Sequence, residues 1–159
     1  MAERDGTNGP TAIVPGPTLD PATLSVGDRL PALVKEPTTR QLVMFAGASG
    51  DFYEIHYDDT VAVESGLPGV IVHGYLKMAW LGELVSSWAG PDAFVQRVDV
   101  SYRGIDVPGV AYRLEGEVTS VTPGDNATTV ELQIWGEGPE GAKTTIGSAA
   151  VQFLTNSGR

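Results

Sequence analysis

The sequence predicts an α+β fold with one long helix and about five antiparallel strands. Residues 74–89 form the longest apolar stretch, and Gly90-Pro91 ends it sharply, which is typical of a core helix. After residue 93 the apolar residues instead alternate with polar ones by about two, which is typical of strands. A helical first half followed by a run of strands favours segregated helix and sheet layers.

Composition and charge limit the class of protein. A chain of 159 residues, 42% hydrophobic and 19% charged, is most simply one globular domain. The formal charge of −10 would repel a phosphate backbone, so we expect no nucleic-acid partner. No cysteine is present, which excludes disulfides and thiolate nucleophiles. There is no signal-peptide pattern and no apolar run near the roughly 20 residues that span a bilayer, so we expect a cytoplasmic protein without a membrane partner.

The beginning of the chain differs from the rest. Residues 1–24 are rich in glycine and proline and hold few large apolar side chains, which predicts a disordered or surface-lying leader. Residues 25–159 are then expected to form a single domain. Its first strand is expected over residues 29–35, before Pro37.

Two short helices are expected before the long one. Thr38 or Thr39 can cap a helix over residues 41–48, whose apolar residues share one side. A second helix is expected over residues 58–65, before a glycine and a proline. The intervening residues 49–58 are expected to form a loop.

The second half is expected to form an antiparallel meander. Turn signals that contain glycine and proline separate its alternating runs, and together with the first strand these runs make about five strands. The runs cover residues 94–102, 110–118, 128–134 and 146–153.

The predicted loop carries a carboxylate and an imidazole close together. Asp51 precedes His56 in the segment Ser-Gly-Asp-Phe-Tyr-Glu-Ile-His. Taken singly, an Asp after a glycine is typical of a turn, and a His between apolar neighbours is typical of a core residue. The chain holds only two histidines, however, and both lie at the edges of this one region. The pair Asp51 and His56 therefore predicts a catalytic acid and base.

The other histidine marks the start of the long helix. Glycine lets a ligand approach the backbone, and the first N–H groups of a helix lie unpartnered at the positive end of its dipole. The N–H of Gly74 is therefore predicted to bind an oxyanion. His73 is a candidate to bind substrate, although its ring would most simply support the loop backbone.

Other chemistries find less support in the sequence. A metal site is not expected, because the chain has no His-x-x-x-His pair and no cysteine. Ser49 lies in Ala-Ser-Gly, not in a Gly-x-Ser-x-Gly elbow, which argues against a serine hydrolase. Basic residues such as Lys77 are scattered singly, although one or two could meet a phosphorylated small ligand.

The motifs of this region resemble the signature of the MaoC-like family of R-specific enoyl-CoA hydratases and 3-hydroxyacyl-thioester dehydratases. The likeness is good over residues 38–90 and weaker through the strands. The residues that carry it are Ser49-Gly50-Asp51, Ile55-His56, Asp58, Gly66 and Ile71-Val72-His73-Gly74. The resemblance implies a hotdog fold, in which an antiparallel sheet wraps a long central helix, and a dimer. It implies further that Asp51 and His56 are catalytic and that the Gly74 N–H holds the thioester oxygen.

The chain departs from this family pattern at two places. Members usually carry Asn-Pro where this chain has Tyr53-Glu54, so the loop must find support elsewhere, and both residues are candidates to bind substrate. Position 82 is glycine, where some members place a hydroxyl residue in contact with the catalytic Asp. Several aromatic residues, including the candidate Tyr75, can line a hydrophobic tunnel, but aromatics at helical spacing are more often core. They are Tyr53, Tyr57, Tyr75, Trp80 and Trp88.

The resemblance thus predicts the reversible hydration of trans-2-enoyl thioesters, of CoA or an acyl carrier, to (R)-3-hydroxyacyl thioesters. No cofactor is expected, because the thioester itself is the handle. The variant of the motif looks more like actinobacterial members, some of which act on steroid side chains. Two alternatives therefore stay open: a subunit of a heteromeric hotdog dehydratase for a bulky acyl-CoA, and an acyl-CoA thioesterase. The expected partners are an acyl thioester and a second hotdog chain, in a homodimer or a heteromer.

Overall fold

A computed structural model describes residues 19–154 of the chain. Within this part, five antiparallel strands and a long helix confirm the predicted α+β class. The elements in chain order are η1 (Pro21–Thr23), β1 (Leu33–Lys35), α1 (Thr39–Ser49), η2 (Glu54–His56), α2 (Asp59–Glu64), α3 (Gly74–Ala89), β2 (Ala93–Tyr102), β3 (Tyr112–Pro123), β4 (Ala127–Glu137) and β5 (Lys143–Leu154).

The order of strands in the sheet is β1-β3-β4-β5-β2. The prediction of a meander is right for β3, β4 and β5, which pair as successive neighbours. It is wrong for β2, which pairs with β5 at the far edge and not with β3, the next strand along the chain. The connection between β2 and β3, residues 103–111, is longer than the two to about five residues of a hairpin loop, and it crosses beneath the intervening strands.

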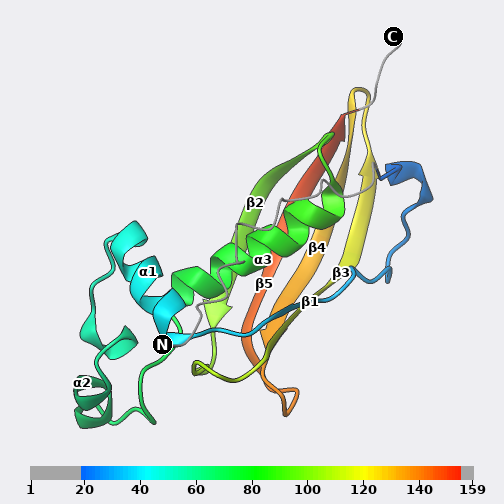
Figure 1. Cartoon of the computed structure of the whole chain (residues 1–159). Helices are drawn as coiled ribbons and strands as arrows, with labels where there is room; N and C mark the ends of the chain where they lie inside the picture. The colour runs from blue at the N-terminus through cyan, green and yellow to red at the C-terminus, as the bar shows by residue number, and fades with distance from the viewer. Residues whose placement is uncertain (1–18, 155–159) are drawn as a thin grey trace, which may run out of the picture.

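Helix α3 lies along one face of the sheet, which curves around it (Figure 1). Its inward residues recur at helical spacing, and they bury the core against the alternate residues of β3, β4 and β5. The principal core side chains are Leu76, Trp80, Leu81, Leu84, Val85, Leu114, Val118, Leu132, Ile134, Val151 and Phe153. This arrangement, a curled antiparallel sheet around a central helix, confirms the hotdog fold.

The short elements begin where the sequence predicts. The Thr38 side chain accepts a hydrogen bond from the Gln41 N–H at the start of α1, and Asp58 caps α2 by accepting from two backbone N–H groups. The first strand is shorter than predicted, because Pro31 has no N–H to donate to the ladder. Arg29 forms only an isolated bridge with Glu117.

The N-terminal leader is described only in part. Residues 1–18 lie outside the described residues, and the prediction of disorder falls mainly on them. Residues 21–23 form a single 3-10 turn capped by Asp20, and Leu24 packs against the core from the surface. Among the described residues no helix is long and apolar enough to cross a bilayer.

Candidate active site

The predicted loop joins α1 to α2 at the end of the molecule where α3 begins (Figure 1). Gly50 ends α1 in the left-handed conformation, with a φ of 77° that favours glycine, and this turns the chain into the loop. The Tyr57 hydroxyl donates to the carbonyl of Phe52 at 2.7 Å, so that Tyr57 braces the loop from within. Within the described residues, this hydrogen bond joins the two ends of the segment between Phe52 and Tyr57.

His56 is buried, and one hydrogen bond sets its orientation. Its Nδ1 lies 2.8 Å from the carbonyl oxygen of Ile71, which can only accept, so Nδ1 carries the hydrogen. In the neutral ring Nε2 is then an acceptor, which is the form a general base requires. Nε2 faces Asp51, whose Oδ2 lies 4.0 Å away. Asp51 keeps 34% of its side chain exposed, so this pair opens toward solvent on the Asp51 side.

His73 lies behind His56. The two imidazole rings stack with 3.8 Å between centroids and 20° between planes, and Phe45 meets His73 edge-on at 5.0 Å. No part of His73 is exposed, and within the described residues neither of its nitrogens has a hydrogen-bond partner. The ring is therefore packed between Phe45 and His56 and is closed to solvent.

Burial lowers the pKa of His73 below its ordinary 6.5, and the neighbouring His56 lowers it further, against a smaller opposing effect of Asp51. Below pH 6.5 the unfolded chain therefore binds this proton more readily than the folded one, and the free energy of unfolding falls as the pH falls. We expect His73→Phe, which keeps an aromatic ring against His56, to flatten this acid loss of stability. Urea unfolding of both proteins between pH 7 and pH 5 measures it, and parallel curves would contradict the assignment.

Asp51, His56 and His73 also bring possible metal ligands together. One ligand atom from each lies within 4.8 Å of the others. The lone pairs of an imidazole lie in its plane, however, and the planes of these stacked rings are nearly parallel, so they do not converge on one ion. The geometry suits a proton-transfer pair with a supporting ring better than a three-ligand metal site.

Gly74 is the first residue of α3, directly after His73. Its N–H is one of the first-turn donors that a helix leaves without an internal partner. Backbone hydrogen bonds hold the segment before it: the Ile71 N–H donates to the Ile55 carbonyl, and the Ile71 carbonyl accepts from His56 Nδ1. The Val72 N–H donates to the Asp106 carbonyl at 2.8 Å. These hydrogen bonds fix the position of the Gly74 N–H relative to the His56 ring.

The remaining candidate residues differ in how exposed they are. Tyr53 and Glu54 are exposed on the loop, and the Tyr53 ring lies edge-on to His56 at 6.4 Å. Tyr75 is 68% exposed beside Gly74. Trp80 is buried and Trp88 packs on Phe153, so these two aromatics belong to the core and not to a tunnel.

A buried ion pair next to this centre was not predicted from the sequence. Lys77, one turn along α3 from Gly74, donates to the Asp106 carboxylate at 2.8 Å and to the Gly104 carbonyl at 3.1 Å. Thr144 on β5 donates to the same carboxylate at 2.7 Å. Lys77 is thus bound within the protein and does not meet a phosphorylated ligand. No local pattern marks this pair, because its members lie far apart along the chain.

A cavity of about 220 Å³ lies on the far side of Asp106. The segments 105–112 and 138–144 line it, and Asp51, His56 and Gly74 are not among its lining residues. Near the candidate site, Phe52 and Tyr53 are exposed on the loop, and Met44 is exposed on α1.

A comparison with protein families decides the classification. The family described as the MaoC like domain matches residues 21–135, most of the described chain. The chain belongs to this family. The match covers the loop, α3 and most of the sheet, so the predicted resemblance is confirmed.

Individual relatives of this MaoC-like chain agree with the family. The 3-oxo-4,17-pregnadiene-20-carboxyl-CoA hydratase beta subunit of Mycobacterium tuberculosis is 31% identical over 102 residues, which are 62% of this chain and 77% of the relative. The (R)-hydratase from A. caviae involved in PHA biosynthesis superposes with a TM-score of 0.75 at 25% identity, over 82% of this chain and 98% of that one. The ChsH1-ChsH2 complex from Mycobacterium tuberculosis gives a TM-score of 0.73 at 23% identity, over 81% of this chain and 98% of the matched chain, and supports the fold. The protein is accordingly a hydro-lyase of the MaoC-like type.

Proposed function

We propose that the protein catalyses the reversible hydration of a trans-2-enoyl thioester to the (R)-3-hydroxyacyl thioester. Asp51 and His56 act as the proton-transfer pair, and the Gly74 N–H binds the thioester oxygen. CoA is the carrier that the name of the hydratase relative favours. The chemistry needs a base, an acid and a polarised carbonyl, so we expect no metal or redox cofactor to take part.

The observation that carries this proposal is the gap between the pair. The 4.0 Å between Asp51 Oδ2 and His56 Nε2 is too long for a direct hydrogen bond. A water oxygen about 2.8 Å from each atom fits across it. Since the Ile71 carbonyl leaves His56 Nε2 as the acceptor, such a water donates one hydrogen to Nε2 and the other to the carboxylate.

The proposed reaction follows from this arrangement. The Gly74 N–H polarises the thioester carbonyl and stabilises the enolate oxygen, an effect of about 3–4 kcal/mol in comparable oxyanion sites. The water oxygen adds to C3 while its proton passes to His56 Nε2. Asp51 stabilises the imidazolium, which returns a proton to C2 from the same face. One water is thereby added in the syn sense, and both residues end as they began.

Two further observations favour a bulky acyl group. A Cβ placed on Gly82 would meet no atom within 4 Å, so α3 leaves open space about two turns from Gly74. The hydratase relative is named for a pregnadiene-carboxyl-CoA, whose acyl group is a steroid. A ring-bearing acyl-CoA is therefore our preferred substrate class, with simple enoyl chains as the alternative.

The exposed apolar surface around the site favours a partner chain. Val43, Met44 and Phe52 keep 54%, 64% and 60% of their surface exposed. Strand β2 also presents a long free edge, since within the described residues it pairs only with β5. We propose that a second hotdog chain covers this side, in a homodimer or, as in the ChsH1-ChsH2 complex, a heteromer. Activity that appears only when a second hotdog chain co-purifies would identify the heteromer.

The proposed function is tested with enoyl-CoAs of increasing size, from crotonyl-CoA to a ring-bearing one. We expect loss of the enoyl absorbance with formation of the (R)-3-hydroxyacyl-CoA, and a kcat lowered by about a thousandfold in His56→Ala. Release of free CoA without hydration would instead identify a thioesterase. Near-native hydration by His56→Ala would overturn the assignment of the base.

A further inference from the structure

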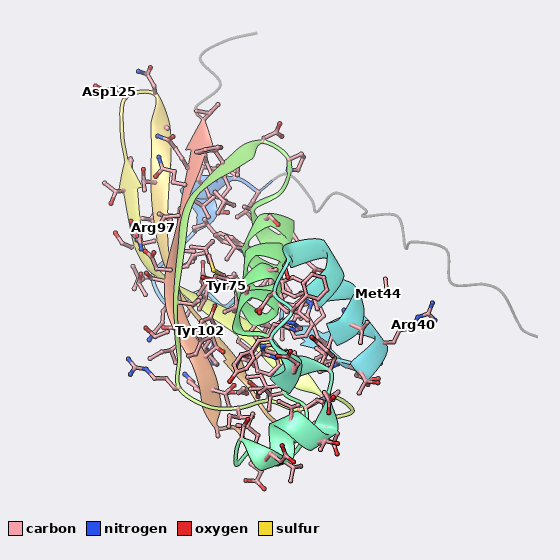
Figure 2. The ribbon with its side chains drawn as sticks, turned by 90° about the vertical axis from the view of Figure 1, so that its left-hand side faces the viewer. Arg40, Met44, Tyr75, Arg97, Tyr102 and Asp125 are labelled. Carbon is pink, nitrogen blue, oxygen red and sulfur yellow. The ribbon has the colours of Figure 1, made fainter. Side chains whose placement is uncertain are left out.

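Tyr102 is the last residue of β2, where this edge strand passes the first turn of α3 (Figure 2). The strand alternates, so that Val98, Val100 and Tyr102 face the helix layer. Figure 2 shows Tyr102 close to Tyr75, in keeping with the effect of Tyr75 on its pKa. Tyr102 keeps 45% of its surface exposed on the same open side as the candidate site.

The Tyr102 ring lies against Gly74 with its hydroxyl end. A Cβ placed on Gly74 would lie 2.9 Å from Cζ and 3.0 and 3.2 Å from the two ring carbons next to it. These are the three ring carbons at the hydroxyl end. The phenolic oxygen is one bond from Cζ, and the Gly74 nitrogen is one bond from Cα. The Tyr102 hydroxyl and the Gly74 N–H therefore both belong to the N-terminal end of α3.

Two features fit Tyr102 to act as a donor. Burial raises its pKa above the ordinary 10.0, and Tyr75 raises it further, so the phenol keeps its proton at neutral pH. The ring is also held in place, because the Lys77 ammonium lies 5.6 Å from its centroid and is itself fixed by Asp106.

We propose that the Tyr102 hydroxyl donates a second hydrogen bond to the thioester oxygen bound at the Gly74 N–H, which makes Tyr102 a further catalytic residue. This inference rests on the proposed function of Gly74. An enolate oxygen carries more negative charge than the ground-state carbonyl, so the added donor acts mainly on the transition state. It also explains why the position next to the ring is a glycine, since any side chain there would displace the phenol from the helix end.

Tyr102→Phe removes the hydroxyl and keeps the ring against Gly74. We expect kcat for the preferred enoyl-CoA to fall by about tenfold to a hundredfold, with little change in KM. Tyr112→Phe is the matched control: the Tyr112 ring also flanks Lys77, at 6.0 Å, but its hydroxyl is buried against Gly136 on β4. This control should keep the kcat of the unaltered protein.

The outcomes separate this inference from the proposed function. Full activity in Tyr102→Phe, together with loss of activity in His56→Ala, would overturn the role of the hydroxyl alone and leave the ring as packing. Absence of hydration with every enoyl-CoA, both by the unaltered protein alone and with its co-purified hotdog partner, would overturn the proposed function, and this inference with it. A drop in kcat that Tyr112→Phe shares would assign the loss to the surroundings of Lys77 and also overturn the donor role.

Discussion

Replacement of Asp51 by Asn is expected to lower kcat for enoyl-CoA hydration by about a thousandfold. The carboxylate faces His56 Nε2 across the 4.0 Å gap that fits a water. An amide offers one acceptor oxygen instead of two and carries no negative charge with which to stabilise the imidazolium. The fold should not suffer, because the Asp51 side chain is 34% exposed and its hydrogen bond from the Tyr53 N–H is long, at 3.5 Å. Steady-state kinetics and thermal unfolding of the purified variant measure both effects.

Asp58→Asn is the control for this substitution. Asp58 lies on the same loop and caps α2, and Asn caps a helix about as well, so both activity and stability should stay close to those of the unaltered protein. An Asp51→Asn variant as active as Asp58→Asn would rule out Asp51 as a member of the proton-transfer pair.

The largest effect on stability is expected from Asp106→Ala. This change leaves the Lys77 ammonium, only 3% exposed, without its carboxylate partner 2.8 Å away. An uncompensated buried charge costs about 3–5 kcal/mol, so the free energy of unfolding should fall by this order. Asp106 also receives the Thr144 hydroxyl, and its loop holds the Val72 N–H just before Gly74, so kcat should fall as well. Urea unfolding measures the change in the free energy of unfolding, and steady-state kinetics measure the change in kcat.

The exposed pair Lys35–Glu83 is the matched comparison. It also joins α3 to another element through a lysine and a carboxylate, at 2.7 Å, but the two side chains are 22% and 48% exposed. Because water screens such a pair, Glu83→Ala should cost less than about 1 kcal/mol. Equal losses in the two variants would mean that the pair of Lys77 and Asp106 is no more important than a surface contact.

Local signals predicted the helices well. The long helix was expected over residues 74–89 and is found there, since the glycine at its start, the apolar period and Gly90-Pro91 at its end all act within a few residues. The cap of α1 is Thr38, one of the two threonines expected there, and α2 begins at Asp59, one residue after the expected start. The order of strands was not predictable in this way. The place of β2 depends on which edge accepts it after a long connection, and alternation alone carries no information on the neighbour of a strand.

The candidate site also has some features that local sequence signals predict and others that depend on long-range packing. The loop with Asp51 and His56, the glycine at the start of α3 and the family of the chain could be predicted from the sequence, because these motifs are contiguous. Which nitrogen of His56 carries the hydrogen depends on the folded structure, through the Ile71 carbonyl 15 residues away. The burial of His73 depends on the folded structure as well.

The pair of Lys77 and Asp106 is the clearest case of the second kind, since its members are 29 positions apart. In the sequence, Lys77 is one isolated cation and Asp106 one acid among many. A charge buried in a medium of low polarity is stable only when another group compensates it. The fold brings that group within hydrogen-bond distance. Local patterns therefore specify the elements and the reacting groups, whereas long-range packing specifies how those groups are oriented and charged.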